Sequence, residues 1–167
     1  MSCPSGTFQP NSSSSSCTLC EPGTFTPGIE FQGCIDCAKG KYAGNSGETV
    51  CSTCLHGSFQ KQPRSAACEL CEPGSFPDLT STECVACGER FSAPVQGIPC
   101  VLCPGVMQPN VEHTQCLCPV GHYANQEEPF TLDQLINNTA ACLTCPSGAN
   151  CNTTGLSVQS MTTLPGY

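Results

Sequence analysis

The sequence contains no tryptophan and only five basic residues, none of which lies after Arg90. Without a basic stripe, the chain is poorly suited to bind nucleic acid or anionic lipid headgroups. Large apolar residues are also scarce, because Leu, Ile, Val and Phe account for only 30 of the 167 residues. Together with a net charge of −8, this composition is typical of a disordered chain. A globular enzyme built on a large apolar core is therefore disfavoured.

Several functional motifs are missing as well. No apolar run reaches the length of a transmembrane helix, and Met1 leads into the first cysteine without a signal-peptide segment. His56, His113 and His122 lie far apart and accompany no serine–histidine–aspartate or paired-carboxylate pattern; we expect His122 to be solvated. No calcium-loop motif is present. We therefore expect no catalytic residue, no metal site, no cofactor and no membrane insertion within this segment.

Cysteine, in contrast, is abundant. The chain has 18 cysteines in 167 residues, about 11%, a level that marks disulfide scaffolds in secreted proteins. Cross-links lower the entropy of the unfolded chain and so stabilise a fold that buries little apolar surface. Because disulfides persist in oxidising compartments, we predict a secreted protein of the extracellular space or cell surface. Its export signal is then expected outside this segment.

A repeat of 16–17 residues organises most of the chain. Each unit carries a C-x-x-C pair followed by two residues, a glycine, any residue and an aromatic, as in residues 17–25. The C-x-x-C pairs begin at Cys17, Cys34, Cys51, Cys68, Cys84, Cys100 and Cys142, with a C-x-C at Cys116 and a half-repeat at Cys3.

The chemistry of this unit predicts a tight turn and short strands. Glycine suits a turn with positive φ, and we expect the aromatic ring to pack on the neighbouring disulfide as the small core of each unit. Two units depart from the pattern, because Phe91 comes one residue early and Met107 takes the aromatic position. Both repeats are shorter, so we expect their deletion near the turn.

Residues 125–141 interrupt the repeat. Thr131 and Gln134 have the spacing of a capping box, and Phe130 and Leu135 occupy the positions of a hydrophobic staple. We predict one short helix over residues 131–137 and very little helix before residue 125.

The cysteine spacing favours one disulfide pattern. Joining the second cysteine of each pair to the first of the next uses all 18 cysteines. The predicted disulfides are Cys3–Cys17, Cys20–Cys34, Cys37–Cys51, Cys54–Cys68, Cys71–Cys84, Cys87–Cys100, Cys103–Cys116, Cys118–Cys142 and Cys145–Cys151. The alternative links first to first and second to second, and leaves Cys3 and Cys151 over. Sequence alone leaves both patterns open.

Two other chemistries also use C-x-x-C. Four thiolates can hold zinc, but 18 is not divisible by four, and the Lys-poor, Ser- and Thr-rich composition is that of extracellular chains. A redox thiol needs a neighbouring basic group or helix N-terminus in a βαβ setting, which the sequence does not indicate. Structural cross-links are therefore predicted.

Three sequons predict N-linked glycans at Asn11, Asn137 and Asn152, all within expected loops or at the helix end. The serines at positions 12–16 leave two interpretations open, an O-glycosylated run or a plain flexible loop.

With the repeat defined, its motif resembles the ephrin-receptor-like cysteine-rich repeat and is similar to single-disulfide modules of TNF-receptor ectodomains. The resemblance covers residues 3 to about 123. The tail from Cys145 to Tyr167 looks like a segment that follows such repeats in very large surface proteins of protists and algae, so we expect the polypeptide to continue. The resemblance implies an extracellular, non-enzymatic segment and carries over no ligand-binding residue.

These observations predict a small disulfide-rich fold, an elongated solenoid or rod of tandem 16–17-residue Cys loops with short β-hairpins and one short helix. We expect three regions: repeats over 1–124, an insertion over 125–141 and a C-terminal Cys motif over 142–167. The expected function is a structural rod that builds a cell-surface or filamentous assembly by self-association. The alternative is a receptor or adhesion ectodomain that binds another extracellular protein.

Overall fold

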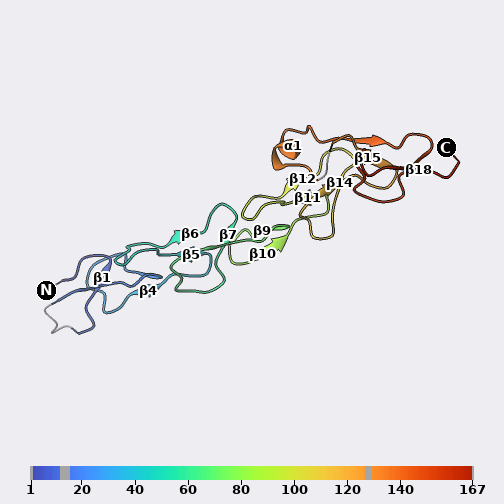
Figure 1. The fold of residues 1–167 in the computed structure, drawn as a ribbon. Coiled ribbons are helices and arrows are strands. Elements are labelled where there is room, and N and C mark those ends of the chain that lie inside the picture. The colour runs from blue at the N-terminus through green and yellow to red at the C-terminus, as the bar shows by residue number, and fades with distance from the viewer. Residues whose placement is uncertain (1, 12–15, 127–128, 167) are drawn as a thin grey trace. The chain divides into compact units, whose positions relative to one another are not determined.

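The chain folds as a series of small hairpins. The computed structural model describes residues 2–11, 16–126 and 129–166 (Figure 1). Within them, strands of two or three residues pair with the next strand along the chain to form nine two-stranded sheets. The elements are β1 (Thr7–Phe8), β2 (Thr18–Leu19), β3 (Thr24–Phe25), β4 (Ile35–Asp36), β5 (Lys41–Tyr42), β6 (Ser52–Thr53), β7 (Ser58–Phe59), β8 (Glu69–Leu70), β9 (Ser75–Pro77), β10 (Cys84–Ala86), β11 (Phe91–Ser92), β12 (Val101–Leu102), β13 (Gln108–Pro109), β14 (Cys116–Leu117), β15 (His122–Ala124), α1 (Leu132–Ile136), β16 (Cys142–Thr144), β17 (Ala149–Asn150) and β18 (Thr162–Thr163). The predicted class, tandem disulfide loops with short hairpins and one helix, is confirmed.

Each hairpin arises directly from the repeat motif. In the second unit, Gly23 turns the chain with φ of 87°, and the next two residues form β3. The two residues between the paired cysteines form the partner strand β4, so that Thr24 faces Asp36 and Phe25 faces Ile35. The C-x-x-C spacing therefore holds one short strand between two cross-links.

Cysteines, rather than aromatic rings, form the buried centre of each repeat. The second cysteine of each pair is buried, except for the half-buried Cys145, and Cys20, Cys37 and Cys71 are fully buried. The ring of Phe25 is only half-buried, whereas the flanking Thr24 and Thr26 are buried. The expectation that the ring supplies the core is wrong in this respect, because the disulfide and small side chains already fill the narrow space between turns.

The shortened repeat around Phe91 has a different register from the one expected. Ser92 is fully buried and faces Val101, so it holds the position that Phe25 holds in its own hairpin. Phe91 faces Leu102 and is partly exposed. The ring therefore does not move into the aromatic position. The distance from Cys87 to Ser92 equals that from Cys20 to Phe25, so the deletion lies in the connection between strands and not near the turn.

Main-chain hydrogen bonds join successive repeats. The amide of Gly23 donates to the carbonyl of Ala43 at 2.8 Å, and the carbonyl of Gly23 accepts from Cys37 at 2.9 Å. Equivalent bonds from Gly6, Gly40 and Gly74 reach the carbonyls of Thr26, Gln60 and Ala93 at 2.8–3.0 Å. The repeats are thus connected by peptide groups and not by a continuous apolar core.

A second left-handed position recurs in successive repeats and was not predicted. It lies at intervals of 16 or 17 residues, and only two of its occupants are glycine. The residues are Glu30, Gly47, Arg64, Ser81, Gly97 and His113, with φ between 55° and 80°. Gly47 and Arg64 donate their amides to the carbonyls of Cys20 and Cys37, both at 2.8 Å. The conformation is therefore imposed by contact between repeats.

Replacing Glu30 with glycine is expected to stabilise unit 1 (residues 1–71 and 77–85) by up to about 1 kcal/mol. A non-glycine residue in the left-handed region costs about 1–2 kcal/mol, which the substitution removes. The greater conformational freedom of glycine in the unfolded chain reduces this gain by about 0.4–1 kcal/mol. Urea unfolding of Glu30→Gly measures the change. Glu83→Gly is the control, because Glu83 lies outside the left-handed region and its replacement should only destabilise.

The predicted helix is present over Leu132–Ile136, one residue shorter at each end than expected. The side chain of Thr131 accepts from the Gln134 amide, and the Gln134 side chain accepts from the Thr131 amide, which confirms the capping box. Phe130 and Leu135 are buried in one cluster with Met107. This cluster is the largest apolar core of its part of the chain.

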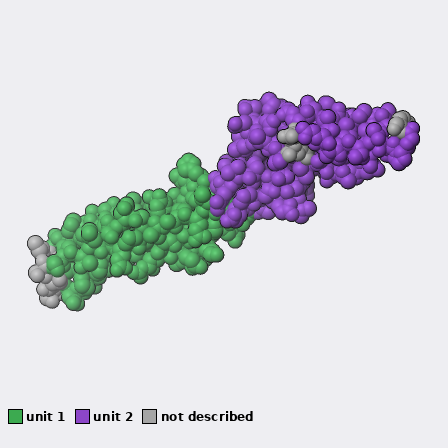
Figure 2. All heavy atoms as spheres, in the orientation of Figure 1, with its two compact units in different colours: residues 1–71, 77–85 green, residues 72–76, 86–167 purple. Residues whose placement is uncertain are grey.

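The chain divides into two compact units (Figure 2). Unit 1 consists of residues 1–71 and 77–85, and unit 2 of residues 72–76 and 86–167. Unit 1 contains only the small cysteine loops, whereas unit 2 also holds α1 and the apolar cluster. The three regions predicted from the repeats and the insertion follow sequence features and stay a prediction.

Candidate functional site

Nine disulfides are the dominant chemical feature of the structure. They join Cys3–Cys17, Cys20–Cys34, Cys37–Cys51, Cys54–Cys68, Cys71–Cys84, Cys87–Cys100, Cys103–Cys116, Cys118–Cys142 and Cys145–Cys151. These are the pairs that the spacing predicts. Their Cα atoms are 5.5–6.1 Å apart, within the range that a disulfide spans without displacing the backbone.

Peptide mapping of the unreduced protein is expected to recover these nine pairs. A peptide that links Cys20 to Cys34 is the informative product, because the alternative pattern places Cys20 with Cys37. Recovery of Cys17 bonded to Cys34 would contradict the sequential pattern.

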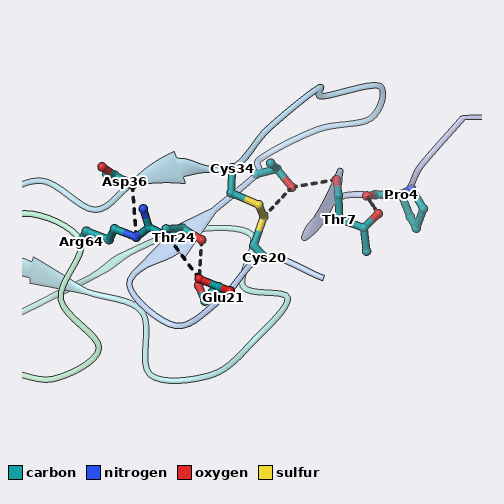
Figure 3. Close-up of a disulfide and its surroundings, with 9 residues drawn as sticks. Pro4, Thr7, Cys20, Glu21, Thr24, Cys34, Asp36 and Arg64 are labelled. Carbon is teal, nitrogen blue, oxygen red and sulfur yellow. Dashed lines mark hydrogen bonds and ion pairs between the residues drawn. A yellow bond between two sulfur atoms is a disulfide. The ribbon is translucent and has the colours of Figure 1, made fainter. Parts of the chain in front are cut away.

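The Cys20–Cys34 disulfide lies close to threonine side chains of its own repeat (Figure 3). The buried Thr26 hydroxyl lies 3.8 Å from Cys20 Sγ and donates to the carbonyl of Thr7 in the preceding repeat at 3.3 Å. The Thr24 hydroxyl donates to the Glu21 carbonyl at 2.7 Å. Both hydroxyls therefore bind the main chain.

Arg64 extends across two earlier repeats to a pair of acidic residues (Figure 3). Its Nη2 lies 3.2 Å from Glu21 Oε2, and its Nε lies 3.9 Å from Asp36 Oδ1. Since all three side chains are more than half exposed, each pair contributes at most about 1 kcal/mol. They border an open groove of about 340 Å³ that also includes Phe8 and Leu19. The arginine charge is already matched, so the groove offers no free anion site.

The three histidines occupy separate structural roles. His56 lies in a left-handed turn, and His113 Nδ1 lies 2.9 Å from the Phe91 carbonyl. His122 is half-buried in β15 opposite Thr144, and its Nδ1 is buried without a hydrogen-bond partner in the described structure. The expectation that His122 is solvated is therefore wrong, because its side chain is half-buried and its Nδ1 is buried.

No group of three or more His, Cys, Asp or Glu side chains within residues 2–11, 16–126 and 129–166 is arranged to hold a metal ion. Among the same residues, no helix has the length and apolar character needed to cross a membrane.

All three predicted glycosylation residues, Asn11, Asn137 and Asn152, lie on the surface. Asn137 is the C-cap of α1, and the Asn152 amide donates to Asn150 Oδ1 at 3.3 Å. Their glycosylation stays a prediction. The serines at positions 12–15, which include the rest of the first sequon, lie outside the described residues.

Two loops built on Asx side chains were missed by sequence reasoning. Asp78 Oδ1 accepts the amides of Thr82 and Glu83 at 2.7 and 3.3 Å, while the Thr80 hydroxyl donates to Oδ2. These hydrogen bonds, led by that from Thr80, lower the pKa of Asp78 from 3.8 to about 2. Asn110 makes the matching bonds to the amides of residues 114 and 115 at 2.8 and 3.0 Å.

The Asp78 loop is expected to lose stability as the pH falls from about 4 towards 2. Because the folded-state pKa is lowered, the stabilisation is complete above the ordinary pKa and disappears as the carboxylate protonates near its folded value. NMR titration of the Asp78 carboxyl group and the Thr82 amide measures this. The variant Asp78→Asn should keep the loop and lose the pH dependence, since Asn110 supports an equivalent loop with an amide oxygen. A loop unchanged at pH 2 in the wild type would contradict the prediction.

Comparison with known proteins finds one similarity, at the N-terminus. Residues 1–32 match the family model described as tyrosine-protein kinase ephrin type A/B receptor-like. This segment is ephrin-receptor-like. The ephrin-receptor-like segment contains the Cys3–Cys17 loop, and the tandem repeats after it share its disulfide and hairpin geometry. A search of curated proteins found no match to the chain. The chain is a cysteine-rich repeat protein of a type common in extracellular proteins, with no catalytic family assigned.

Proposed function

We propose that the chain is a non-enzymatic structural element of the extracellular space that builds or spaces a cell-surface or filamentous assembly by self-association. The observation that carries the proposal is the repeated main-chain hydrogen bonding between successive repeats. Examples are the bond from the Gly23 amide to the Ala43 carbonyl and the bond from the Cys37 amide to the Gly23 carbonyl. Because peptide groups make these bonds, side chains on the surface can vary without loss of the scaffold. Such a chain is useful because it provides a regular series of repeats that disulfides cross-link.

The surface of the described residues supports the same proposal. Its grooves are open, and one of them is bordered by Arg64, whose charge is paired with Glu21 and Asp36. The described side chains that line this groove include no nucleophile beside a base. What this groove offers is therefore contact with the surface of another molecule.

A specific observation favours the alternative, a receptor or adhesion segment that binds a protein ligand. Leu79 and Val111 are almost fully exposed, at 106% and 92%, on the two loops that Asp78 and Asn110 hold in place. Exposed apolar side chains on ordered loops are suited to fill a pocket on a partner.

Sedimentation velocity over a wide concentration range, on residues 1–167 secreted under oxidising conditions, tests the proposal. Self-association that rises with concentration is expected, with negative-stain images showing regular assemblies. A monomer at the highest concentration that binds a separate protein with nanomolar affinity would overturn the proposal in favour of the receptor alternative. The double variant Leu79→Ser/Val111→Ser should leave self-association unchanged and abolish such binding.

A further inference from the structure

Helix α1 and strand β12 of unit 2 are in contact (Figure 1). An apolar groove lies between them. The groove has a volume of about 500 Å³, and Val101, Leu102, Leu135 and Ile136 contribute side chains to its lining. Leu135 is buried, but Leu102 and Ile136 are 51% and 61% exposed. Exposed apolar surface of this kind normally marks a place where something else packs.

A glycosylation sequon forms the rim of this groove. Asn138, the middle residue of the sequon Asn137-Asn138-Thr139, lines the groove, and Asn137 directly follows the exposed Ile136. Asn137 is exposed, and its main-chain amide is held by the carbonyl of Asp133 at 2.9 Å as the C-cap of α1. Its side chain therefore starts from a fixed position beside the apolar lining.

We propose that Asn137 carries an N-linked glycan and that the first N-acetylglucosamine of this glycan packs on Leu102 and Ile136, covering the groove. A sugar ring presents C–H groups on its faces and hydroxyls on its rim, so it can bury apolar surface while remaining hydrated outside. Attachment to the rim gives the sugar a high effective concentration at the groove, which a free partner lacks.

The modification itself is a glycosyl transfer from a lipid pyrophosphate-linked oligosaccharide in the secretory pathway. The Nδ2 atom of Asn137 forms a bond to the anomeric carbon of the sugar. The bond from that carbon to the pyrophosphate oxygen breaks, and the lipid pyrophosphate leaves with the electron pair. One proton of Nδ2 is released to a base.

A second sequon of unit 2 has the same relation to a second groove. Thr154, the last residue of the sequon at Asn152, lines a groove of about 370 Å³ whose other lining residues are both apolar, such as Val111 and Leu117, and polar, such as Asn110 and Glu112. Val111 is 92% exposed. Both sequons of unit 2 are therefore exposed and border a groove that contains exposed apolar side chains, which supports the view that attached sugars cover such surfaces.

The glycan proposal rests on one element of the proposed function, namely that the chain is exported to the extracellular space. Self-association is measured separately from glycan occupancy and groove protection, so either idea can fail while the other stands.

The test uses the full chain secreted from eukaryotic cells. Glycopeptide mass spectrometry measures occupancy of Asn137, and an endoglycosidase trims the glycan to a single N-acetylglucosamine. Hydrogen exchange is then compared between the trimmed protein and Asn137→Gln over residues 101–105 and 132–138. The trimmed protein is expected to retain protection, whereas Asn137→Gln should exchange roughly fivefold faster there and melt about 2–4 °C lower.

Two variants control the comparison. Leu102→Thr removes one of the two apolar side chains on which the sugar is proposed to pack. Strand β12 should still form, because Thr53 holds the equivalent position in strand β6. In this background, Asn137→Gln should no longer change exchange or melting temperature. Asn152→Gln removes the other glycan predicted in unit 2 and should leave exchange at residues 101–105 unchanged.

Three outcomes would overturn the proposal. Asn137 could prove unoccupied, or occupied with exchange identical to that of Asn137→Gln. Equally, protection of residues 101–105 that depends on protein concentration would show that a second copy covers the groove.

Discussion

Replacing Gly23 with alanine is expected to lower the stability of unit 1 by about 2–5 kcal/mol. Gly23 has φ of 87°, and an alanine there costs about 1–2 kcal/mol through backbone strain alone. A Cβ atom would also lie 2.3 Å from the main-chain oxygen of Arg64, two repeats further along the chain. Relieving this overlap requires repeats to move apart, which adds about 1–3 kcal/mol. Urea unfolding measures the loss.

Two other glycines separate these effects. Gly121 also has positive φ, at 83°, but a Cβ atom added there would have no neighbour within 4 Å, so Gly121→Ala should show the backbone strain alone. Gly33 lies outside the left-handed region and has open space around its Cα, and Gly33→Ala should be close to neutral. Equal losses for Gly23→Ala and Gly121→Ala would show that the close approach to Arg64 does not matter.

Removing the Cys20–Cys34 disulfide is expected to lower stability by about 2–5 kcal/mol and to unfold much of unit 1 at 37 °C. The disulfide closes a segment with a sequence separation of 14, and Cys20 is fully buried. No apolar core compensates for the lost cross-link, because Phe25, the aromatic side chain of this repeat, is itself only half-buried. The double variant Cys20→Ala/Cys34→Ala, compared with wild type by non-reducing thermal unfolding, measures this loss.

The matched control is Cys145→Ala/Cys151→Ala. That disulfide has a sequence separation of only 6, so its removal returns less entropy to the unfolded chain and should cost less. Equal losses from the two double variants would contradict the loop-entropy explanation and indicate that sulfur packing decides the stability.

The features set by local chemistry could be predicted from the sequence. The capping box of Thr131 and Gln134 specifies where α1 begins, because both partners lie within four residues of each other. The turn at Gly23 and the strand between Cys34 and Cys37 follow in the same way from residue type and spacing.

Features that depend on contact between repeats could not be predicted. The left-handed position that Glu30 and Arg64 share has glycine in only two of its six occurrences, so residue type does not reveal it, and neighbouring repeats impose the conformation. The register that places Ser92 instead of Phe91 opposite Val101 depends on which side chain fits the narrow interior. The groove of α1 was missed because its two sides, β12 and the helix, are 30 residues apart in sequence.

The sequential disulfides also determine how the chain responds to a pulling force. In the repeat from Cys20 to Cys37, the shortest covalent path crosses 5.7 Å between the Cα atoms of the disulfide and then follows three residues. At 3.3–3.6 Å per residue, these three add about 10 Å, so a stretched oxidised repeat reaches about 16 Å. The same 17 residues would reach nearly 60 Å, about 3.4 Å each, after reduction. A stretched oxidised repeat therefore reaches only about a quarter of the length of a reduced one, so the redox state of the surroundings sets how far the chain can extend.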